Sequence, residues 1–379
     1  MILTTCAACA APLAHDAPRC VRCKLRYCNA TCQHDHWRRG HKQMCKKIHR
    51  GGNAEQYHAD KKYKEAVAEA VEACADDTKG QTCYICTQAL HWKTKEGLVR
   101  GCSCRGTAGF AHVSCLAEQA KILMDEAEEN NLDAKALNER FERWYTCSLC
   151  EQRYHGVVMN ALGWACWKKY VGRPETDQLR QIAISILGNG LQNAEQYEEA
   201  LSVQEAELSM LRRLCASEQS LLDTQSNLAI SYLQLERLEQ AVNAFRGVYS
   251  GRLKLDGEEH ENTLIAANNY ADSLNGLKRF KEAKSLLRKT MPVARRVLGE
   301  GNEHTLKMRW VYARALYSDP DATLDDVRES VETLEDAERI ARRVLGGAHP
   351  ITKEMGNDLG TTRAVLLRAC ETLSPPGSA

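Results

Sequence analysis

The segment that decides the fold begins at Cys83 and reads CYICTQALHWKTKEGLVRGCSCRGTAGFAHVSC through Cys115, and the pair Cys147 and Cys150 follows it. Seven cysteines and one histidine in this stretch have metal-ligand spacing. Structural zinc takes four nitrogen or sulfur ligands, and a Cys-x2-Cys pair supplies two of them from one tight turn. The sequence therefore predicts a module with two structural zinc ions, bound by Cys83, Cys86, Cys102, Cys104, His112, Cys115, Cys147 and Cys150.

The spacing distinguishes this module from PHD fingers. Those fingers have a longer gap within the second cysteine pair and a shorter run to the histidine, whereas here one residue separates Cys102 from Cys104 and seven residues separate Cys104 from His112. Over residues 83–150 the stretch resembles RING-CH domains. The resemblance implies a cross-brace in which one zinc is bound by Cys83, Cys86, His112 and Cys115, and the other by Cys102, Cys104, Cys147 and Cys150.

RING-CH domains in known proteins commonly act as ubiquitin ligases, and the resemblance implies the same activity here. Each zinc has four protein ligands, so no open position remains to activate water, and we expect no catalytic side chain. Catalysis would consist of docking a ubiquitin-conjugating enzyme and holding its thioester in a reactive pose. Ile85 matches the apolar position that touches that enzyme in ligases, and Leu149 would extend the same patch.

Three features depart from the RING-CH pattern. A long insert rich in Glu, Ala and Lys, Leu116–Trp144, precedes the last cysteine pair and is predicted to form a helix. Glu151 directly follows Cys150, so a ubiquitin-locking arginine is not evident there. Trp144 lies just before the last cysteine pair rather than well upstream of it. The long gap with Tyr145, two residues before the seventh ligand, is also reminiscent of PHD fingers. A module that only binds partners and a reader of histone tails therefore remain alternatives to a ligase.

A second eight-ligand pattern lies nearer the N-terminus. Its spacing is Cys-x2-Cys-x10-Cys-x2-Cys-x4-Cys-x3-Cys-x8-His-x3-Cys, in which each of the last two pairs lies on one helical face. A module as short as residues 1–50 does not bury a self-sufficient core, so metal must hold it together. We therefore expect two more zinc ions, bound by Cys6, Cys9, Cys20, Cys23, Cys28, Cys32, His41 and Cys45.

The order of these ligands, with Tyr27 before Cys28, Gln33 after Cys32 and Trp37 before His41, resembles the MYND zinc finger. The resemblance implies an interleaved pairing, with one zinc on Cys6, Cys9, Cys28 and Cys32 and the other on Cys20, Cys23, His41 and Cys45. Known MYND fingers bind short proline-containing peptides of partner proteins, so a peptide partner is implied. Some lie beside a lysine-methyltransferase SET domain, for which this sequence offers no candidate.

Basic residues dominate this first module. Residues 1–50 contain ten Lys/Arg and two Asp/Glu. Seven thiolates and two Zn²⁺ would add about −3, which leaves a charge of roughly +5. Such a surface suits an acidic partner, but the same charges would also keep a module with little core soluble, and the sequence leaves both explanations open.

Internal repetition characterises the C-terminal half. Ala229 and Ala271 are 42 residues apart, and the hexapeptide ARRVLG occurs at 294–299 and again at 341–346. Small residues at such positions let two helices approach closely. The pattern resembles tetratricopeptide repeats in the long form of kinesin light chains, and it predicts an all-α solenoid over residues 178–370 that ends in a capping helix.

A solenoid of this kind presents a concave groove to a peptide. Asn227 and Asn269 occupy equivalent first-helix positions, where they would hydrogen-bond a peptide backbone or else simply face solvent. Three threonines near helix starts are predicted to be N-caps: Thr263, Thr305 and Thr352.

The bulk composition limits the remaining function classes. The formal charge is +1 and no long apolar run exists, so we expect no nucleic-acid partner and no membrane. Cys6 and Cys9 near the start, with no signal-peptide pattern, predict an intracellular protein, cytoplasmic or nuclear. No Walker loop, Rossmann fingerprint or His-Glu-x-x-His is present, and no small-molecule substrate is expected.

These patterns predict small zinc-stabilised modules followed by an all-α solenoid, with four structural Zn²⁺ per chain. They also predict a ubiquitin ligase that recruits substrates through the MYND finger and the repeats, and a non-catalytic scaffold is the alternative. The predicted segments are a MYND-type finger at 1–50, a connecting helix at 51–82, a RING-CH-type finger with a helical insert at 83–155, a bridging helix at 156–177, repeats with a capping helix at 178–370, and a flexible tail at 371–379.

Overall fold

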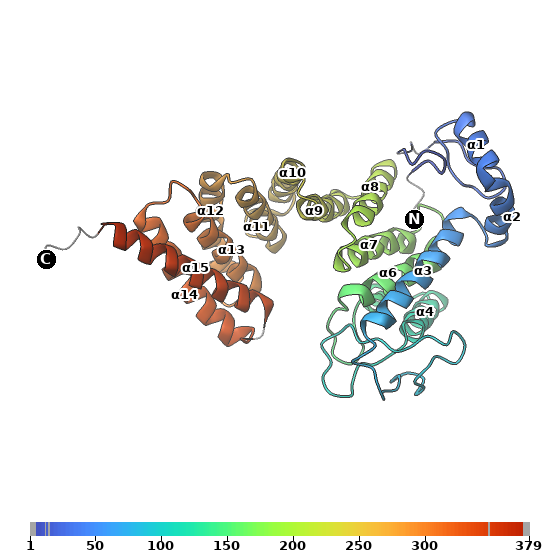
Figure 1. Ribbon diagram of the computed structural model, residues 1–379, viewed down its shortest axis with the longest axis horizontal. Helices are drawn as coiled ribbons and strands as arrows, with labels where there is room; N and C mark the ends of the chain where they lie inside the picture. The colour runs from blue at the N-terminus through green and yellow to red at the C-terminus, as the bar shows by residue number, and fades with distance from the viewer. Residues whose placement is uncertain (1–4, 12, 14–15, 348, 374–379) are drawn as a thin grey trace. The chain divides into compact units, whose positions relative to one another are not determined.

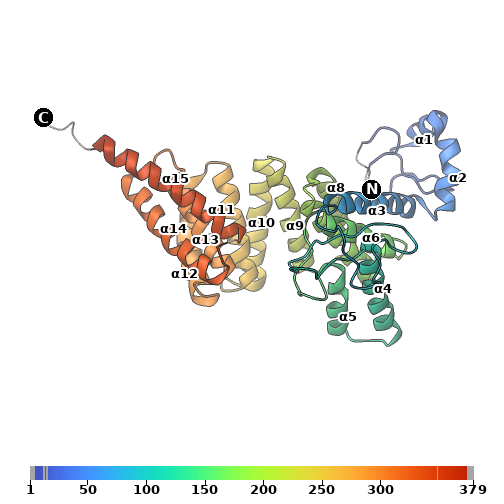
Figure 2. The ribbon, with the colours of Figure 1, turned by 60° about the horizontal axis from the view of Figure 1, so that its bottom comes forward.

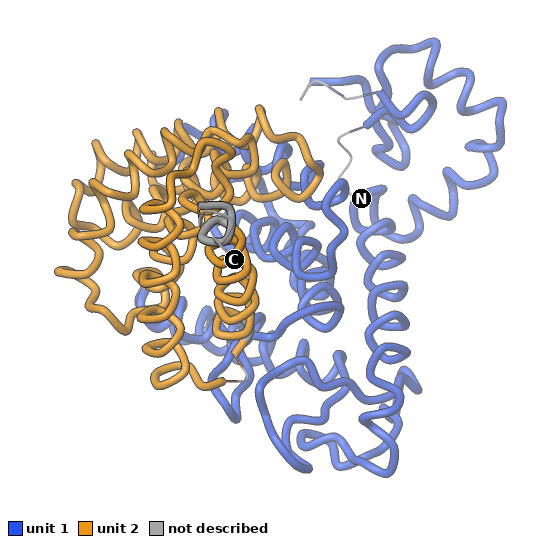
Figure 3. The backbone as a smooth tube through the Cα atoms, turned by 60° about the vertical axis from the view of Figure 1, so that its left-hand side comes forward, with its two compact units in different colours: residues 1–216 blue, residues 217–379 orange. Residues whose placement is uncertain are grey.

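The computed structural model describes residues 5–11, 13, 16–347 and 349–373. Across these residues the structure is helical, with isolated β-bridges and no strand. The chain forms two compact units, residues 1–216 and 217–379 (Figure 3). The Cys/His clusters lie in the first unit and a helical solenoid makes up the second, which confirms the predicted fold class. The predicted tail lies outside the described residues from 374 onward.

Three short helical segments form the N-terminal module, and a glycine sets the direction of the last one. These helices are α1 (Ala30–His36), the π-helical turn η1 (Trp37–His41) and α2 (Lys42–Arg50). Asn29 begins α1, because its side chain accepts a hydrogen bond from the backbone N–H of Cys32 at 2.9 Å. Gly40 adopts a φ of 118°, which favours glycine, and breaks the helix before the buried His41.

One helix precedes the RING-CH-like stretch and further helical segments lie within it. The first is α3 (Ala54–Ala73), and those within the stretch are α4 (Val113–Glu129), α5 (Ala134–Phe141) and the 3-10 turn η2 (Glu142–Trp144). The prediction of one helix across the insert is therefore wrong. Asn131 adopts a left-handed φ of 48°, and Asp133 starts α5 by accepting a hydrogen bond from the N–H of Ala136 at 2.8 Å. Asn and Asp favour such breaks because their side chains bond the local backbone.

Helix α6 (Gly156–Tyr170) is the central helix of the first unit (Figure 1). It packs against α3, α4 and α7 (Gln178–Asn193), and α8 (Tyr197–Arg213) packs on α7. Trp164 and Trp167 on α6 are each 2% exposed. A Cβ at Gly190 would lie 2.9 Å from the Met159 carbonyl oxygen, so glycine permits the close approach of α6 and α7. α6 thus belongs to the core of this unit.

Seven helices of the second unit each pack on the next (Figure 2). They are α9 (Glu218–Gln234), α10 (Leu238–Asp256), α11 (Glu261–Gly276), α12 (Phe280–Val297), α13 (Glu303–Tyr317), α14 (Leu324–Val344) and α15 (Pro350–Leu373). Ala229 and Ala271 are fully buried, as close helix packing requires. This arrangement is the tetratricopeptide-like solenoid that the repeats predict.

The predicted threonine caps of this unit are wrong at all three positions. The hydroxyls of Thr263 and Thr305 donate instead to main-chain carbonyl groups of the preceding helices, at 3.3 and 3.4 Å. The N-caps are His260 and Asn302, whose side chains accept backbone N–H groups two residues further on. Each threonine lies one turn inside its helix and ties that helix to the one before it. The third, Thr352, is not a cap either, because it is buried inside the first turn of α15, which begins at Pro350.

Candidate metal centres

Sixteen cysteine and histidine side chains gather into four groups of four. Within each group the potential ligand atoms all lie within 4.8 Å of one another. The structure brings together every candidate ligand of the sequence analysis, in the sets that the two resemblances imply. These are Cys6, Cys9, Cys28 and Cys32; Cys20, Cys23, His41 and Cys45; Cys83, Cys86, His112 and Cys115; and Cys102, Cys104, Cys147 and Cys150.

Each Cys-x2-Cys pair lies in a tight turn of one kind, which we call a knuckle. The first residue of a knuckle donates its N–H to the carbonyl five residues on, and its own carbonyl accepts the N–H four residues on. The residue after the second cysteine has a left-handed φ between 55° and 64° in all four knuckles: Ala10, Lys24, Thr87 and Glu151. This turn points both sulfurs of a pair to the same side, where one metal ion can bind them.

A fifth knuckle, His91–Glu96, has the same two backbone hydrogen bonds but no cysteine. Its Thr94 occupies the place of the second ligand, and the backbone N–H of Thr94 donates to Nδ1 of His91 at 3.1 Å. The centroid of the His91 ring lies 5.3 Å from that of His112, so this knuckle packs beside a metal ligand but supplies none itself. Sequence analysis missed this turn, although the spacing of His91 and Thr94 is that of a ligand pair.

Distances between the sulfurs fit zinc and not disulfides. A tetrahedral site with Zn–S bonds of about 2.3 Å places sulfurs about 3.8 Å apart, whereas a disulfide bond is about 2.0 Å long. The described cysteines are all free. The sulfur pairs lie 3.6 Å apart for Cys9–Cys28, 3.9 Å for Cys9–Cys32, 3.7 Å for Cys20–Cys45 and 3.8 Å for Cys104–Cys147.

The two histidine ligands use different ring nitrogens. Nδ1 of His112 lies 3.4 and 3.5 Å from the sulfurs of Cys86 and Cys115, and its Nε2 lies 3.4 Å from the carbonyl oxygen of Ala89. In the N-terminal module Nε2 of His41 lies 3.4 Å from the sulfur of Cys23. A hydrogen bond on the second nitrogen orients a metal-binding imidazole, and the Ala89 carbonyl is placed to accept it.

Burial and hydrogen bonding shift the pKa values of several ligand side chains. It lowers the pKa of His41 and of His112, which favours the neutral imidazole that binds metal. Burial would raise the pKa of Cys6, but hydrogen bonds from the backbone N–H groups of Ala8 and Cys28 lower it to about 6. Soft sulfur and nitrogen donors at these spacings are the ligand set that Zn²⁺ prefers.

The two predicted contact residues for a conjugating enzyme are both accessible. Ile85 is 36% exposed and Leu149 is 51% exposed, and each lies in the middle of a knuckle. The residues just before them are joined, because the hydroxyls of Tyr84 and Ser148 lie 3.1 Å apart. This contact links the two knuckles, and each of them carries an accessible apolar side chain.

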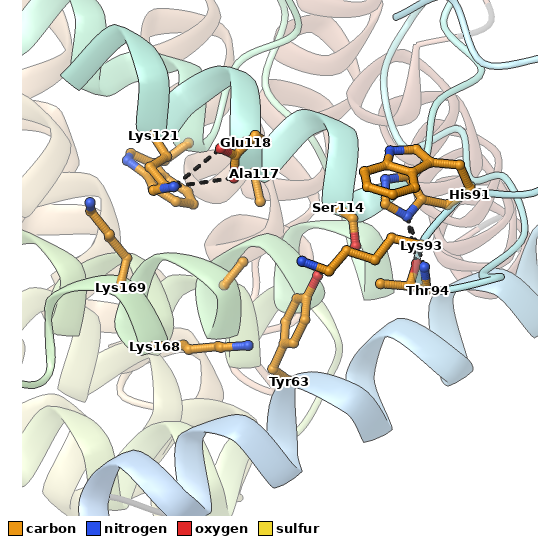
Figure 4. Close-up of a pocket in the computed structure, with 13 residues that line it drawn as sticks. Tyr63, His91, Lys93, Thr94, Ser114, Ala117, Glu118, Lys121, Lys168 and Lys169 are labelled. Atoms are coloured by element: carbon orange, nitrogen blue, oxygen red, sulfur yellow. Dashed lines mark hydrogen bonds and ion pairs between the residues drawn. The ribbon is translucent and has the colours of Figure 1, made fainter. Parts of the chain in front are cut away.

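A cavity of about 680 Å³ lies between α3, α4, α6 and the fifth knuckle (Figure 4). Trp92, which sequence analysis did not single out, lies at this knuckle's tip and is 69% exposed. Three of the four lysines lining the cavity form ion pairs at 2.8–3.1 Å: Lys121 with Glu118, Lys168 with Asp60, and Lys169 with Asp125. Nearby carboxylates thus balance most of the positive charge here.

Asn227 and Asn269, the predicted peptide contacts in the repeats, are half-buried on α9 and α11. Oδ1 of Asn269 accepts a hydrogen bond from the side chain of Asn268 at 3.4 Å. The next equivalent position, 42 residues on, is Val311, which is 3% exposed. The row of asparagines therefore ends after two repeats.

Residues 83–150 match the model of the RING-variant domain. Residues 220–296 match the model of a tetratricopeptide repeat. The chain thus combines a RING-variant domain with tetratricopeptide repeats, in agreement with the ligand pattern and the repeat pattern.

Two solved structures resemble the helical part. One holds nearly identical TPR-like repeats of a Podosopora anserina kinesin light chain, at 20% identity and a TM-score of 0.41, covering 61% of this chain and 97% of that one. The other is BtubC (BKLC) from P. vanneervenii, at 15% identity and a TM-score of 0.40, covering 70% and 93%. No curated protein sequence matches the chain. Of the helices in the described residues, none combines the length and the apolar character that crossing a bilayer requires.

Proposed function

We propose that the protein is a zinc-dependent ubiquitin ligase of the RING-variant class. One observation carries the proposal: within the RING-variant domain, the two knuckles that bear Ile85 and Leu149 are joined by the contact of Tyr84 with Ser148, and both apolar side chains are accessible. Together they would form the surface that docks a ubiquitin-conjugating enzyme. Zinc would be structural in all four clusters, where it would fix the loops and leave no position for water.

The chain's own residues then act by binding and orientation. A ligase of this kind needs no nucleophile, because the thioester and the attacking lysine belong to the enzyme and the substrate that it brings together. The side chains of Ile85 and Leu149 would exclude water from the docking surface. The hydrogen-bonded pair of Tyr84 and Ser148 would keep the two knuckle tips in a constant relative position.

Substrate recruitment falls to the other modules. The MYND-like module and the tetratricopeptide repeats would each bind a peptide of a protein partner, in an intracellular compartment where the cysteines stay reduced. Asn227 and Asn269 are the proposed backbone contacts in the repeats.

A non-catalytic scaffold is the second candidate. Glu151, with a left-handed φ of 55°, occupies the position after the last ligand, where a ubiquitin-locking arginine would stand in the resembling ligases. In a scaffold the same apolar surface would bind a partner without a transfer step.

An autoubiquitination assay of the full-length, zinc-loaded chain across a panel of conjugating enzymes tests the proposal. Ile85→Ala is expected to abolish chain formation. Val21→Ala is the matched control, because Val21 is also an exposed apolar residue within a knuckle, at 86% exposure, but belongs to the other module. Metal analysis of each variant verifies that zinc is retained. If Ile85→Ala forms ubiquitin chains as well as the wild type does, this docking surface is refuted. If the wild type forms no chains with any enzyme of the panel, the scaffold is favoured.

A further inference from the structure

The fifth knuckle, His91–Glu96, carries an exposed tryptophan on a turn that closes without metal. Trp92 is 69% exposed, whereas the tryptophans of η2 and α6 are all buried. The turn has its own polar contacts: Oγ1 of Thr94 lies 2.8 Å from Nδ1 of His91 and donates to the carboxylate of Glu96 at 3.1 Å. Tryptophan is enriched among the residues that contribute most to protein interfaces, so Trp92 marks a candidate contact.

Glu96 fixes this knuckle to helix α4. Its carboxylate accepts hydrogen bonds from the backbone N–H and the hydroxyl of Ser114, both at 2.7 Å. The hydroxyl oxygen of Ser114 also lies 3.2 Å from that of Tyr63 on α3. The turn that bears Trp92 is thus held in place before any partner arrives. A partner would lose little free energy in ordering it.

Trp92 stands beside the cavity of about 680 Å³ between α3, α4 and α6. Apolar groups of Trp92, Ala117 and Ala165 and the ring of Tyr63 contribute to its lining. None of the lining residues is a candidate zinc ligand, so the cavity is separate from the metal centres. Its volume lies in the range of about 300–1,000 Å³ that is typical of ligand pockets.

Lysines dominate the charged lining of this cavity, which contains four lysines and one glutamate. Three of the lysines have carboxylate partners. Lys93, the residue after Trp92, forms no ion pair with a described residue, and its side chain points into the cavity (Figure 4). Lys64 and Lys95 also lack such partners, but neither belongs to the lining. A partner in the cavity therefore meets one uncompensated cation next to the exposed tryptophan.

We propose that this cavity binds a short peptide segment of a protein partner, with one bulky apolar side chain against Trp92 and a neighbouring carboxylate on Lys93. The one uncompensated cation matches one carboxylate. Nucleic acid fits less well, because it presents a row of phosphates, which the carboxylates paired with the other lysines would repel. The inference goes beyond ubiquitin transfer and applies equally to a scaffold.

A random peptide library displayed on phage, selected on the full-length, zinc-loaded chain, tests the proposal. Each round includes depletion on Trp92→Ala, which removes peptides that bind the MYND-like module or the repeats. The surviving sequences are expected to place Asp or Glu next to a bulky apolar residue. The most enriched sequence is then synthesised with a fluorescent label as the probe. Failure to enrich any peptide after depletion would overturn the proposal.

Fluorescence anisotropy with this probe supplies tests that the selection does not impose. Ala117→Leu extends a lining side chain into the cavity and is expected to weaken binding about tenfold or more, as for the loss of an interface anchor. Lys93→Gln is expected to weaken it about two- to fivefold, with a smaller dependence on salt. A second probe has the acid replaced by its amide. Lys93→Gln should weaken binding of the acidic probe but not of the amide probe.

Matched controls separate the cavity from its surroundings. Leu90→Ala removes a side chain that is 58% exposed, just before the knuckle but outside the lining, and Lys64→Gln removes an unpaired cation of α3 outside it. Both should bind the probe as the wild type does. Zinc content is measured for every variant, because His91 lies beside the ligand His112.

Wild-type affinity in Ala117→Leu, with zinc retained, would overturn the proposal. Equal losses for the acidic and the amide probe in Lys93→Gln would overturn the assignment of the carboxylate to Lys93. Displacement of the probe by single-stranded DNA would replace the peptide with nucleic acid. Since the assay contains no conjugating enzyme, its result is independent of the ligase assay.

Discussion

Gly109 lies where a side chain would collide with the metal centre of the RING-variant domain. Its φ is +84°, and a Cβ built on it would lie 2.6 Å from Cβ of Cys104, 3.0 Å from the Cys104 sulfur and 3.2 Å from the Cys102 sulfur. These atoms cannot move aside freely, because they belong to two ligands of one cluster. Gly106, three residues earlier in the same loop, has a φ of +61° and no atom near its missing Cβ.

The expected cost of Gly109→Ala has two parts. A left-handed φ costs a residue other than glycine about 1–2 kcal/mol, and overpacking costs about 1–3 kcal/mol. Gly106→Ala incurs only the cost of the left-handed φ. If the loop relaxes in the metal-free protein, the whole strain energy of the metal-bound loop appears as a loss of zinc affinity. Zinc binding to the cluster of Cys102 and Cys104 should therefore weaken by about 30-fold to a few thousandfold in Gly109→Ala, and by about 5- to 30-fold in Gly106→Ala, at about 1.4 kcal/mol per factor of ten.

Competition with a chelator of known affinity measures the difference, with released zinc followed by a chromogenic dye. The other three clusters act as an internal reference, since neither substitution touches them. Cobalt replacement adds a spectroscopic check, because a site with four sulfurs and a site with three sulfurs and one nitrogen absorb differently. Equal zinc release from the two variants would refute the argument that Gly109 is required to avoid contact with the ligands.

Two further predictions follow from contacts within each unit. Trp164→Ala should lower the free energy of unfolding of the first unit by about 3–5 kcal/mol, because the buried indole leaves a cavity, whereas Trp92→Ala, at an exposed position, should change it by less than about 0.5 kcal/mol. Urea unfolding of the two variants decides this, and equal losses would contradict the assignment of α6 to the core. In the second unit a hydrogen bond from Nζ of Lys284, at 2.9 Å, lowers the pKa of Asp319. This carboxylate therefore stabilises the fold above its unfolded pKa of about 3.9, and the contribution is lost as the pH falls through the lower folded value. Asp319→Asn should flatten the loss of stability below about pH 4, and an acid-unfolding curve identical to the wild type would contradict that role.

Sequence alone determined where the ligand clusters lie and what could bind there. Cysteine pairs with two residues between them produce knuckles because local backbone hydrogen bonds suffice to form these turns, so their ligands can be identified without knowing the rest of the fold. The four ligand sets came from resemblance to two kinds of zinc finger, and the structure forms the same sets. The solenoid was equally predictable, because small residues repeated every 42 positions make helix pairs that contact only their neighbours.

Two other features arise from local backbone bonding that neither composition nor a search for cysteine ligands reveals. The insert before Cys147 has a uniform helical composition, and only the local bonding of Asn131 and Asp133 divides it in two. His91–Glu96 forms a knuckle without cysteines, which a search for ligands passes over.

Tertiary structure alone decided which charges have partners and which apolar residues are exposed. α6 reads as a linker, yet it is the core of its unit because α3, α4 and α7 converge on it. Lys168 and Lys169 of α6 pair with carboxylates of α3 and α4, whereas Lys42, Lys46 and Arg50 of α2 form no ion pair with a described residue. Composition counts charges but does not place them, and pairing depends on distances that exist only after the chain has folded.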